Sequence, residues 1–334
     1  MSRRVLVTGA SGFLGRHAIA PLLERGFEVH AVSRNPHASP PGLTRGSMAP
    51  HAISRERDPR VKPGDDGLGS DWPGRLALHR VDLLDHPATA ALVRTVRPTH
   101  LLHFAWDVTP GRYWQASENL DWVAASLHLY RAFAAAGGSR VVAAGTCAEY
   151  DWLQPRLEED APLRPATLYG TAKHALHQVL AAAAANDGIG LAWGRIFFLY
   201  GPHEAPPRLV PSVVMPLLQG EPAMVGDGLA RRDFMHVADV AAALVCVLDS
   251  EFAGPVNIAT GRCHPIRDVV EAIGTQIGRP DLIRLGARPT PPGEPRELAA
   301  TGAALAGLGF KPQFGLQDGL ADTIAWWRRQ MQAA

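Results

Sequence analysis

The chain has 334 residues and is long enough to bury a core as one large domain or two modest ones. Its 33 Lys and Arg residues balance its 32 Asp and Glu residues, which argues against a nucleic-acid-binding surface and against an acidic disordered tail. No apolar run reaches the length of a membrane span, no signal peptide precedes the first strand, and the three cysteines lie far apart. We therefore expect a soluble cytoplasmic protein without a membrane partner. The 14 histidines show no metal-ligand spacing, so no metal site is expected.

Residues 4–34 read as a strand, a glycine turn, a helix and a second strand. Gly9, Gly12 and Gly15 lie in the turn, where the lack of a side chain lets the backbone approach a phosphate and lets the helix pack close to the sheet. The first N–H groups of the helix would then face the phosphates. This unit predicts a dinucleotide site, although the GxxGxxG spacing alone also fits an ordinary tight turn.

Residues 35–75 interrupt the pattern, because they are rich in Pro, Gly and charged residues and have almost no apolar periodicity. A structureless loop of this length is unusual within a compact domain. We interpret it as an inserted irregular loop at the surface. Deletion of residues 38–70 is then expected to leave folding and turnover nearly intact.

Strands and helices alternate regularly after this loop. Beyond Tyr200 the predicted segments are shorter and prolines are frequent. Strands are predicted at 76–81, 100–105, 140–144 and 189–197, and helices at 87–96, 113–136 and 168–186. The alternation predicts an α/β fold with a doubly wound parallel sheet of Rossmann type, over residues 1–200. Residues 201–334 read as a smaller mixed α/β lobe that mainly binds substrate. Its predicted elements are helices 237–248, 265–278 and 316–329 and strand 255–258.

Tyr169 and Lys173 stand four residues apart on a predicted helix and therefore share one face. A free tyrosine has a pKa of about 10, and a nearby cation lowers that pKa by stabilising the phenolate. Tyr169 could then act as a general acid or base. Thr146 follows the preceding predicted strand. Because ligands of open α/β sheets bind beyond the carboxyl ends of the strands, Thr146 is placed to hydrogen-bond the same substrate oxygen.

Several short motifs accompany this pair. They are VTGASGFLG at residues 7–15, Asp82-Leu83, His103-Phe104-Ala105, Asn119, Thr146, Tyr200-Gly201-Pro202 and the run from Arg232 to Val237. With them the chain resembles the extended short-chain dehydrogenase/reductases, and more narrowly the NAD-dependent epimerase/dehydratase family that acts on nucleotide sugars. The resemblance covers nearly the whole chain apart from residues 35–75. It implies an enzyme with a nicotinamide cofactor and a nucleotide-diphosphate sugar as its substrate.

The resemblance also implies roles for residues at matching positions. The residues that would hold the cofactor are Gly9, Gly12, Phe13, Leu14, Gly15, Asp82, Leu83, Ala105, Tyr169 and Lys173. Arg232 would contact the substrate pyrophosphate, which suits the bidentate geometry of guanidinium on phosphate. Asn119 would support the site, with an ordinary helix residue as an equal alternative. Arg208, Arg288 and Glu294 in the smaller lobe are further candidates for substrate binding.

Departures from the family pattern bear on the chemistry. The 4,6-dehydratases of the family carry an Asp-Glu pair directly after the threonine, where this chain has Cys147 and Ala148, so dehydration is not expected. Phe198 stands where an asparagine often contacts the sugar. A cysteine near position 147 is an acid or base in some 3,5-epimerases. We keep Cys147 as a candidate substrate-binding residue but favour a structural role for it.

Ser33 and Arg34 lie at the end of the second predicted strand. An acidic residue there would bind the 2′-hydroxyl of NAD, whereas an arginine accommodates the 2′-phosphate of NADP. Both residues are therefore assigned to the cofactor site. NADP(H) is favoured as the cofactor, with NAD(H) as the alternative.

A preference for NADPH indicates reduction, since a reductase takes fresh hydride in each turnover whereas an epimerase keeps its NAD bound. We expect a reductase of a nucleotide-diphosphate 4-keto-6-deoxysugar that uses Tyr169, Lys173 and Thr146 at C4. A nucleotide-sugar 4-epimerase with retained NAD is the alternative, and a non-catalytic NADP(H)-binding regulator is a third. The resemblance also implies a homodimer through helices 113–136 and 168–186, unless these helix faces only cover the sheet.

Overall fold

The computed structural model describes residues 3–34, 75–154, 156–290 and 293–333. Its main sheet contains β1 (Arg4–Thr8), β2 (Glu28–Ser33), β3 (Leu76–Arg80), β4 (His100–His103), β5 (Arg140–Thr146), β6 (Gly190–Ile196) and β10 (Gly254–Ile258). These seven strands lie in the order β10-β6-β5-β4-β1-β2-β3, and every neighbouring pair is parallel. The strand order reverses between β1 and β4, the position at which such sheets bind ligands. The predicted doubly wound, Rossmann-type sheet is confirmed.

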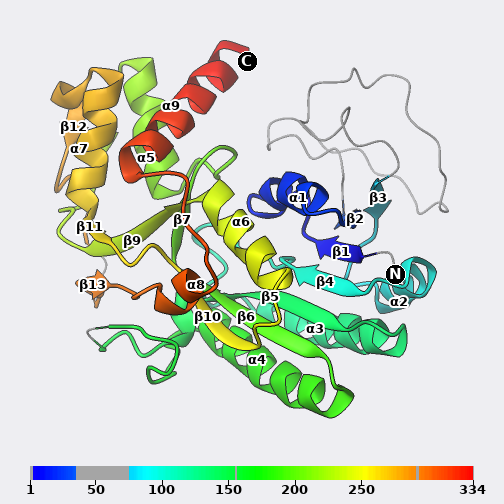
Figure 1. Ribbon diagram of the computed structural model, residues 1–334. Helices are drawn as coiled ribbons and strands as arrows, with labels where there is room; N and C mark the ends of the chain where they lie inside the picture. Colours follow the sequence, from blue (N-terminus) through cyan, green and yellow to red (C-terminus); the bar gives the residue numbers. More distant parts are fainter. Residues whose placement is uncertain (1–2, 35–74, 155, 291–292, 334) are drawn as a thin grey trace.

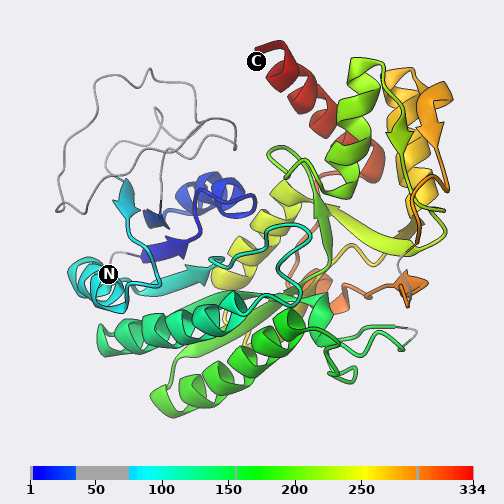
Figure 2. The ribbon, with the colours of Figure 1, turned by 180° about the vertical axis from the view of Figure 1, so that it is seen from behind.

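Helices cover both faces of this sheet (Figure 1). One face packs against α1 (Gly15–Glu24) and α6 (Val237–Leu248). The other packs against α2 (His86–Val96), α3 (Glu118–Ala135) and α4 (Leu168–Asp187), which lie side by side in Figure 2. Because both faces are covered, the central strand β5 is buried at every residue, and its sequence RVVAAGT is mostly apolar.

A smaller lobe packs beyond the carboxyl ends of the strands (Figure 1). Its sheets contain β7 (Phe198–Tyr200), β9 (Arg231–His236), β11 (Cys263–Pro265) and β13 (Glu297–Leu298), and separately β8 (Ala223–Met224) with β12 (Ile283–Arg284). Its helices are α5 (Leu209–Gln219), α7 (Ile266–Ile277) and α9 (Leu316–Ala333), with a 3-10 turn at η2 (Pro280–Leu282). The short helix α8 (Ala303–Gly307) packs against β10 of the main sheet, and the 3-10 turn η1 (Cys147–Glu149) directly follows β5. A mixed lobe follows the Rossmann-type sheet, as the sequence predicts.

Two elements that the sequence analysis places in the smaller lobe belong to the main sheet instead. β10 pairs with β6 as the edge strand, and α6 packs against α1. The reason is that Val256 and Ile258 join the same apolar cluster as Val240 and Leu244 of α6. The chain therefore returns to the first sheet after residue 200.

The predicted helix 113–136 is also shorter in the structure, because α3 begins at Glu118. Residues 110–115 form turns. The side-chain amide of Asn119 donates hydrogen bonds to the carbonyls of Tyr113 and Ala116, both at 2.8 Å. The backbone N–H of Asn119 also donates to the carbonyl of Ala116, at 3.2 Å. Asn119 thus anchors the turn that precedes α3.

Two further expectations concern other parts of the chain. Nearly all of the predicted insertion, residues 35–74, lies outside the described residues. Among the helices that the structure does describe, none is long and apolar enough to cross a membrane.

Candidate active site

The glycine turn after β1 leaves no room for side chains. Gly9 has φ +68°, and a Cβ atom there would lie 2.9 Å from the backbone nitrogen of Ala105. A Cβ on Gly15 would lie only 2.2 Å from the carbonyl oxygen of Gly9. The residue before α1, Leu14, has no side chain that caps the helix, and the N–H groups of Arg16 and His17 donate to the carbonyls of Gly12 and Leu14 at 3.3 and 3.1 Å. The positive end of the helix dipole still faces the turn and favours an anion there. The turn therefore fits a dinucleotide pyrophosphate.

Thr8 ties the ends of β1 and β4 together beside this turn. Its hydroxyl oxygen accepts hydrogen bonds from the N–H groups of Phe104 and Ala105, at 3.2 and 3.3 Å, and lies 2.7 Å from His103 Nδ1. His103 Nε2 lies 2.9 Å from the Ser126 hydroxyl. Burial lowers the pKa of His103 to about 3, so the ring is neutral and only bridges the two elements. Ala105 is thereby held against Gly9.

The adenosine side of the predicted cofactor site lies at the ends of β2 and β3. The hydroxyls of Ser11 and Ser33 are 2.5 Å apart, and Arg34 is exposed. Asp82 is also exposed and accepts a hydrogen bond from the N–H of Leu84 at 3.1 Å, while Leu83 is buried. The predicted residues of this side therefore lie at the carboxyl edge of the sheet. Phe13 and Leu14, partly buried, lie in the turn between Gly12 and Gly15.

Tyr169, Lys173 and Thr146 meet where α4 begins beside the end of β5. The Thr167 hydroxyl caps α4 by accepting a hydrogen bond from the N–H of Gly170 at 3.1 Å. A Cβ on Gly170 would lie 2.3 Å from the carbonyl oxygen of Ala148, so glycine lets the first turn of α4 rest on η1. All three predicted catalytic side chains are buried, at 8, 4 and 8% exposure.

The charge states differ from the sequence-based expectation. Lys173 Nζ donates to the carbonyl of Ala144 at 2.8 Å, and burial lowers the pKa of Lys173 to about 7. Burial also raises the pKa of Tyr169, and the charges of neighbouring groups such as Tyr113 add to this rise, while a hydrogen bond with Thr146 lowers it in part. Removal from water therefore outweighs the stabilisation of the phenolate that was expected from Lys173. Tyr169 is a protonated phenol at neutral pH.

Aromatic side chains that the sequence analysis did not assign surround Tyr169. Ring centroids of Tyr113, Trp114 and Trp106 lie 4.9, 5.8 and 6.3 Å from that of Tyr169. Trp152 lies against Trp114 at 6.2 Å. The sequence signal is the spacing of Trp106, Tyr113 and Trp114, but Tyr113 and Trp114 are assigned to the predicted helix 113–136. We call Trp106, Tyr113, Trp114 and Trp152 the aromatic wall.

Asn119 organises this wall. Besides its two bonds to backbone carbonyls, its side-chain oxygen accepts a hydrogen bond from Trp106 Nε1 at 2.8 Å. Asn119 is 2% exposed. The geometry favours the supporting role over that of an ordinary helix residue.

Cys147 lies next to Thr146 but packs into a separate cluster. It is 6% exposed and contacts the cluster of Tyr150, Leu157 and Phe197. Burial raises the pKa of the Cys147 thiol to about 12, so the thiol stays protonated at neutral pH. These observations favour the structural role.

The candidates of the smaller lobe form two separate groups. Arg232 donates to Glu294 at 2.8 Å and to the carbonyl of Pro295 at 2.9 Å. Glu294 and the exposed Arg288 line a hollow of about 190 Å³. Arg208 instead donates to the carbonyl of Val108 at 3.1 Å, and its guanidinium lies 5.4 Å from the ring centre of Tyr113. Arg208 is thus joined to the Tyr169 group through the aromatic wall.

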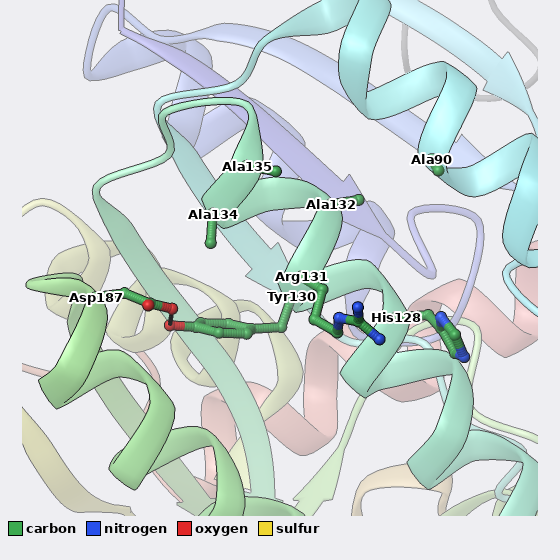
Figure 3. A pocket seen from close by; sticks show the side chains of 8 residues that line it. All are labelled: Ala90, His128, Tyr130, Arg131, Ala132, Ala134, Ala135 and Asp187. Atoms are coloured by element: carbon green, nitrogen blue, oxygen red, sulfur yellow. Dashed lines mark hydrogen bonds between the residues drawn. The ribbon is translucent and has the colours of Figure 1, made fainter.

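A larger hollow, of about 580 Å³, lies away from this chemistry. It is open to the surface beside α3 and is lined by residues of α2, α3 and the end of α4 (Figure 3). In it the Tyr130 hydroxyl donates to Asp187 at 2.8 Å, and both side chains point toward each other in Figure 3. No predicted site residue lines it.

In the described part of the chain, one group of side chains has the spacing of a metal site. Glu149, His174 and His177 hold ligand atoms within 4.8 Å of one another. However, the Glu149 carboxylate already accepts hydrogen bonds from Thr146, Trp193 and Arg195, and the guanidinium of Arg195 repels a cation. The donor set therefore does not fit a metal ion.

The cofactor edge and the Tyr169 helix both lie within residues 5–259, over which the sequence matches the NAD dependent epimerase/dehydratase family. The chain belongs to this family. It is an enzyme of the extended short-chain dehydrogenase type with a nicotinamide cofactor.

Several known proteins are similar to this chain over nearly its whole length. UDP-glucose 4-epimerase 3 of Oryza sativa subsp. japonica is 28% identical, covering 97% of this chain and 90% of that protein. dTDP-glucose 4,6-dehydratase of Streptomyces griseus is 28% identical, covering 98% and 95%. The solved structure of the UDP-glucose 4-epimerase of Thermus thermophilus with NAD has a TM-score of 0.77 at 26% identity, covering 97% of this chain and 99% of that one. That of MoeE5 with UDP-glucuronic acid and NAD has a TM-score of 0.78 at 28% identity, covering 98% and 99%.

Proposed function

We propose that the chain is an NADP(H)-dependent reductase of a nucleotide-diphosphate 4-keto-6-deoxysugar. The observation that carries this proposal is the end of β2, where Ser33 and the exposed Arg34 stand in place of an acidic residue. A guanidinium there binds a 2′-phosphate, whereas a carboxylate would repel it. The NAD named with the related structures belongs to those proteins, and the preference for NADPH is where this chain departs from them.

The protonation of Tyr169 supports reduction. When bound, the cofactor supplies the hydride for C4. Tyr169 then gives its proton to the oxygen that becomes a hydroxyl, and Thr146 holds that oxygen by a hydrogen bond. A reductase needs a protonated phenol before hydride transfer. Burial raises the pKa of Tyr169 and therefore favours the protonated form. Lys173, buried beside it, would hold the nicotinamide ribose and favour charge separation during proton transfer.

The walls of the site support a deoxygenated sugar. The aromatic wall and Ala148 offer apolar surface beside Tyr169 rather than carboxylates. Aromatic faces pack against the C–H groups of a sugar ring and against a methyl group at C6. A dehydratase would need an acid and a base where Cys147 and Ala148 stand.

We further propose that Arg232 and Glu294 bind the nucleotide half of the substrate. The hollow beside Glu294 has a volume of about 190 Å³ and combines apolar and polar lining. Arg232 is 4% exposed and forms an ion pair with Glu294, so the pyrophosphate would displace the Glu294 carboxylate from the Arg232 guanidinium.

We propose that residues 1–200 mainly bind the cofactor and that residues 201–334 mainly bind the substrate, although α6 and β10 belong to the main sheet.

Assembly is proposed from the outer faces of α3 and α4. Leu120 on α3 and Val179 on α4 are 61% and 51% exposed. A second copy seated there would form a four-helix interface and a homodimer, in a cytoplasmic enzyme. The molecular mass in solution tests this directly, and a monomer would contradict it.

The function is tested with nucleotide-linked 4-keto-6-deoxysugars and both reduced cofactors. We expect NADPH to be consumed in proportion to the alcohol formed, with a higher kcat/KM than NADH.

The second candidate is a 4-epimerase, favoured by the UDP-glucose 4-epimerases among the relatives. It requires purified protein that contains NAD and interconverts two sugar epimers without added cofactor. A non-catalytic regulator would bind NADPH and do neither.

A further inference from the structure

A carboxylate lies buried beneath the catalytic residues and is not part of the mechanism above. Glu149 is fully buried, at 0% exposure. Its Oε1 accepts hydrogen bonds from the backbone N–H of Thr146 at 2.8 Å and from Trp193 Nε1 at 2.9 Å. Its Oε2 accepts one from Arg195 Nε at 3.1 Å. A buried charge is costly unless it is paired and hydrogen-bonded, and this one is both.

The partner of Glu149 is also enclosed. Arg195 is 1% exposed, and its Nη1 donates to the Tyr150 hydroxyl at 3.0 Å and to the carbonyl of Glu159 at 2.9 Å. The Tyr150 hydroxyl in turn donates to Asn257 on β10 at 2.7 Å. The network thus has a near end at Thr146 and a far end at β10.

The backbone around Gly145 and Thr146 leaves room for the Glu149 carboxylate at the near end of the network. A Cβ on Gly145 would lie 2.1 Å from Trp193 Nε1 and 2.7 Å from Glu149 Oε1, so only glycine lets these groups lie against β5. Thr146 and Glu149 form a capping box, in which the threonine hydroxyl accepts from the N–H of Ala148 at 3.2 Å. The threonine that faces Tyr169 is therefore held through both its backbone and its side chain.

We propose that Glu149 is a positioning residue of the catalytic centre, which fixes Thr146 opposite Tyr169 and favours the charged form of Lys173. This inference rests on the proposed role of these three residues, but it holds for reduction and for epimerisation alike. A neutral side chain of the same shape at position 149 would keep the fold but would remove the negative charge near Lys173.

The electrostatics agree with the geometry. Burial lowers the pKa of Lys173, and the charge of Glu149 is the opposing influence that raises it. Glu149 also adds to the raised pKa of Tyr169. Other titratable groups around the carboxylate are Arg195, Tyr150, Cys147, His174 and His177. His177 is neutral at pH 7, because burial lowers its pKa to about 4.

The first test measures the charge of Lys173 without any substrate. The chain has only three lysines, so lysine labelled with ¹³C at Cε gives three resonances, and Lys173→Arg identifies the buried one. In Glu149→Gln we expect the pKa of Lys173 to fall by about one unit, the effect of removing one nearby opposite charge. Tyr150→Phe is the matched control, since it cuts the far end of the network only, and it should leave that pKa unchanged.

The second test uses kcat as a function of pH. Loss of the negative charge lowers the pKa of both Lys173 and Tyr169, so the protonated forms are lost earlier and the basic limb of kcat moves to lower pH in Glu149→Gln. We expect a fall in kcat of about tenfold or more, with KM changed far less. Tyr150→Phe should keep the basic limb. Absence of turnover in the wild type would contradict the proposed function and leave the lysine titration to decide on Glu149.

Two outcomes with a folded variant overturn the proposal. One is a folded Glu149→Gln with the wild-type Lys173 pKa and the wild-type profile. The other is a shift of equal size in Tyr150→Phe, which would assign the effect to the network as a whole. If Glu149→Gln does not fold, the pair Glu149→Gln with Arg195→Gln removes both charges and should shift Lys173 in the same direction. If that also fails, Glu149→Asp keeps the charge and withdraws it from Thr146, and an unchanged kcat then overturns the proposal.

Discussion

The ammonium group of Lys173 lies over the ring of Trp106, with Nζ 3.9 Å from the ring centre. The indole N–H of Trp106 is bonded to Asn119, and the ammonium also donates to the carbonyl of Ala144. A desolvated cation over an aromatic face gains on the order of 2 kcal/mol. Trp106 thus links the supporting residue Asn119 to the lysine of the catalytic pair. The aromatic wall beside Tyr169 therefore also contacts the ammonium group of Lys173.

Replacement of Tyr169 by Phe should abolish turnover and spare cofactor binding. The phenol donates the proton to the substrate oxygen, and loss of a general acid costs about 10²–10⁴ in rate. We would measure kcat together with the Kd for NADPH by fluorescence. Tyr130→Phe is the matched control, because its hydroxyl is bonded to Asp187 on the outer surface of α3 and α4. Unchanged turnover in Tyr169→Phe would exclude the mechanism.

Replacement of Gly15 by Ala should disturb both the turn and cofactor binding. The new methyl group would lie 2.2 Å from the carbonyl oxygen of Gly9, and backbone cannot yield as a flexible side chain does. Overpacking of this kind costs about 1–3 kcal/mol of folding free energy. Gly307→Ala, at an exposed helix end with no atom within 4 Å, should be neutral. Thermal unfolding with and without NADPH measures both effects; equal behaviour of the two variants would contradict the close-packed turn.

Replacement of Arg34 by Ala should weaken NADPH but not NADH. A hydrogen bond to a charged group contributes about 1.5–3 kcal/mol, so KM for NADPH should rise roughly 10-fold or more. Arg94→Ala removes an exposed arginine from α2 instead and should change neither KM. An equal rise of KM for both cofactors would show that Arg34 does not read the 2′-phosphate.

Glu204 should make the folded chain less stable as pH rises. Burial raises the pKa of this carboxyl group from 4.5 to about 8, and one of its oxygens has no partner among the described residues. The folded state therefore holds a proton that the unfolded state loses between these pH values, so stability falls as pH rises through them. Glu204→Gln removes this loss, and we expect it to match the wild type below pH 4.5 and to exceed it by about 5 kcal/mol above pH 8. Chemical denaturation at several pH values measures the difference; parallel curves would contradict the raised pKa.

The parts of the site that sequence reasoning found are local patterns. The glycine turn, Tyr169 with Lys173, and Thr146 each lie within a few residues of a strand end or on one helix turn, so their spacing, together with the predicted strands and helices, indicates where they lie. The aromatic wall depends on side-chain bonds from Asn119 to the turn that precedes α3, and periodicity does not reveal such bonds. The position of β10 depends on pairing with β6, some 60 residues earlier in the chain. Glu149 was open to discovery as the last residue of a T-x-x-E capping pattern, but its buried arginine partner was not.

In the proposed reaction the enzyme consumes NADPH to reduce a nucleotide-linked 4-ketosugar. The most direct measurement incubates the purified protein with a nucleotide-diphosphate 4-keto-6-deoxysugar and NADPH and follows the nicotinamide absorbance together with the sugar product. We expect one NADPH to be oxidised for each 4-hydroxyl group formed, with NADH as a poorer hydride donor. Interconversion of two 4-hydroxy epimers on tightly bound NAD, with no net oxidation of added NADPH, would contradict it.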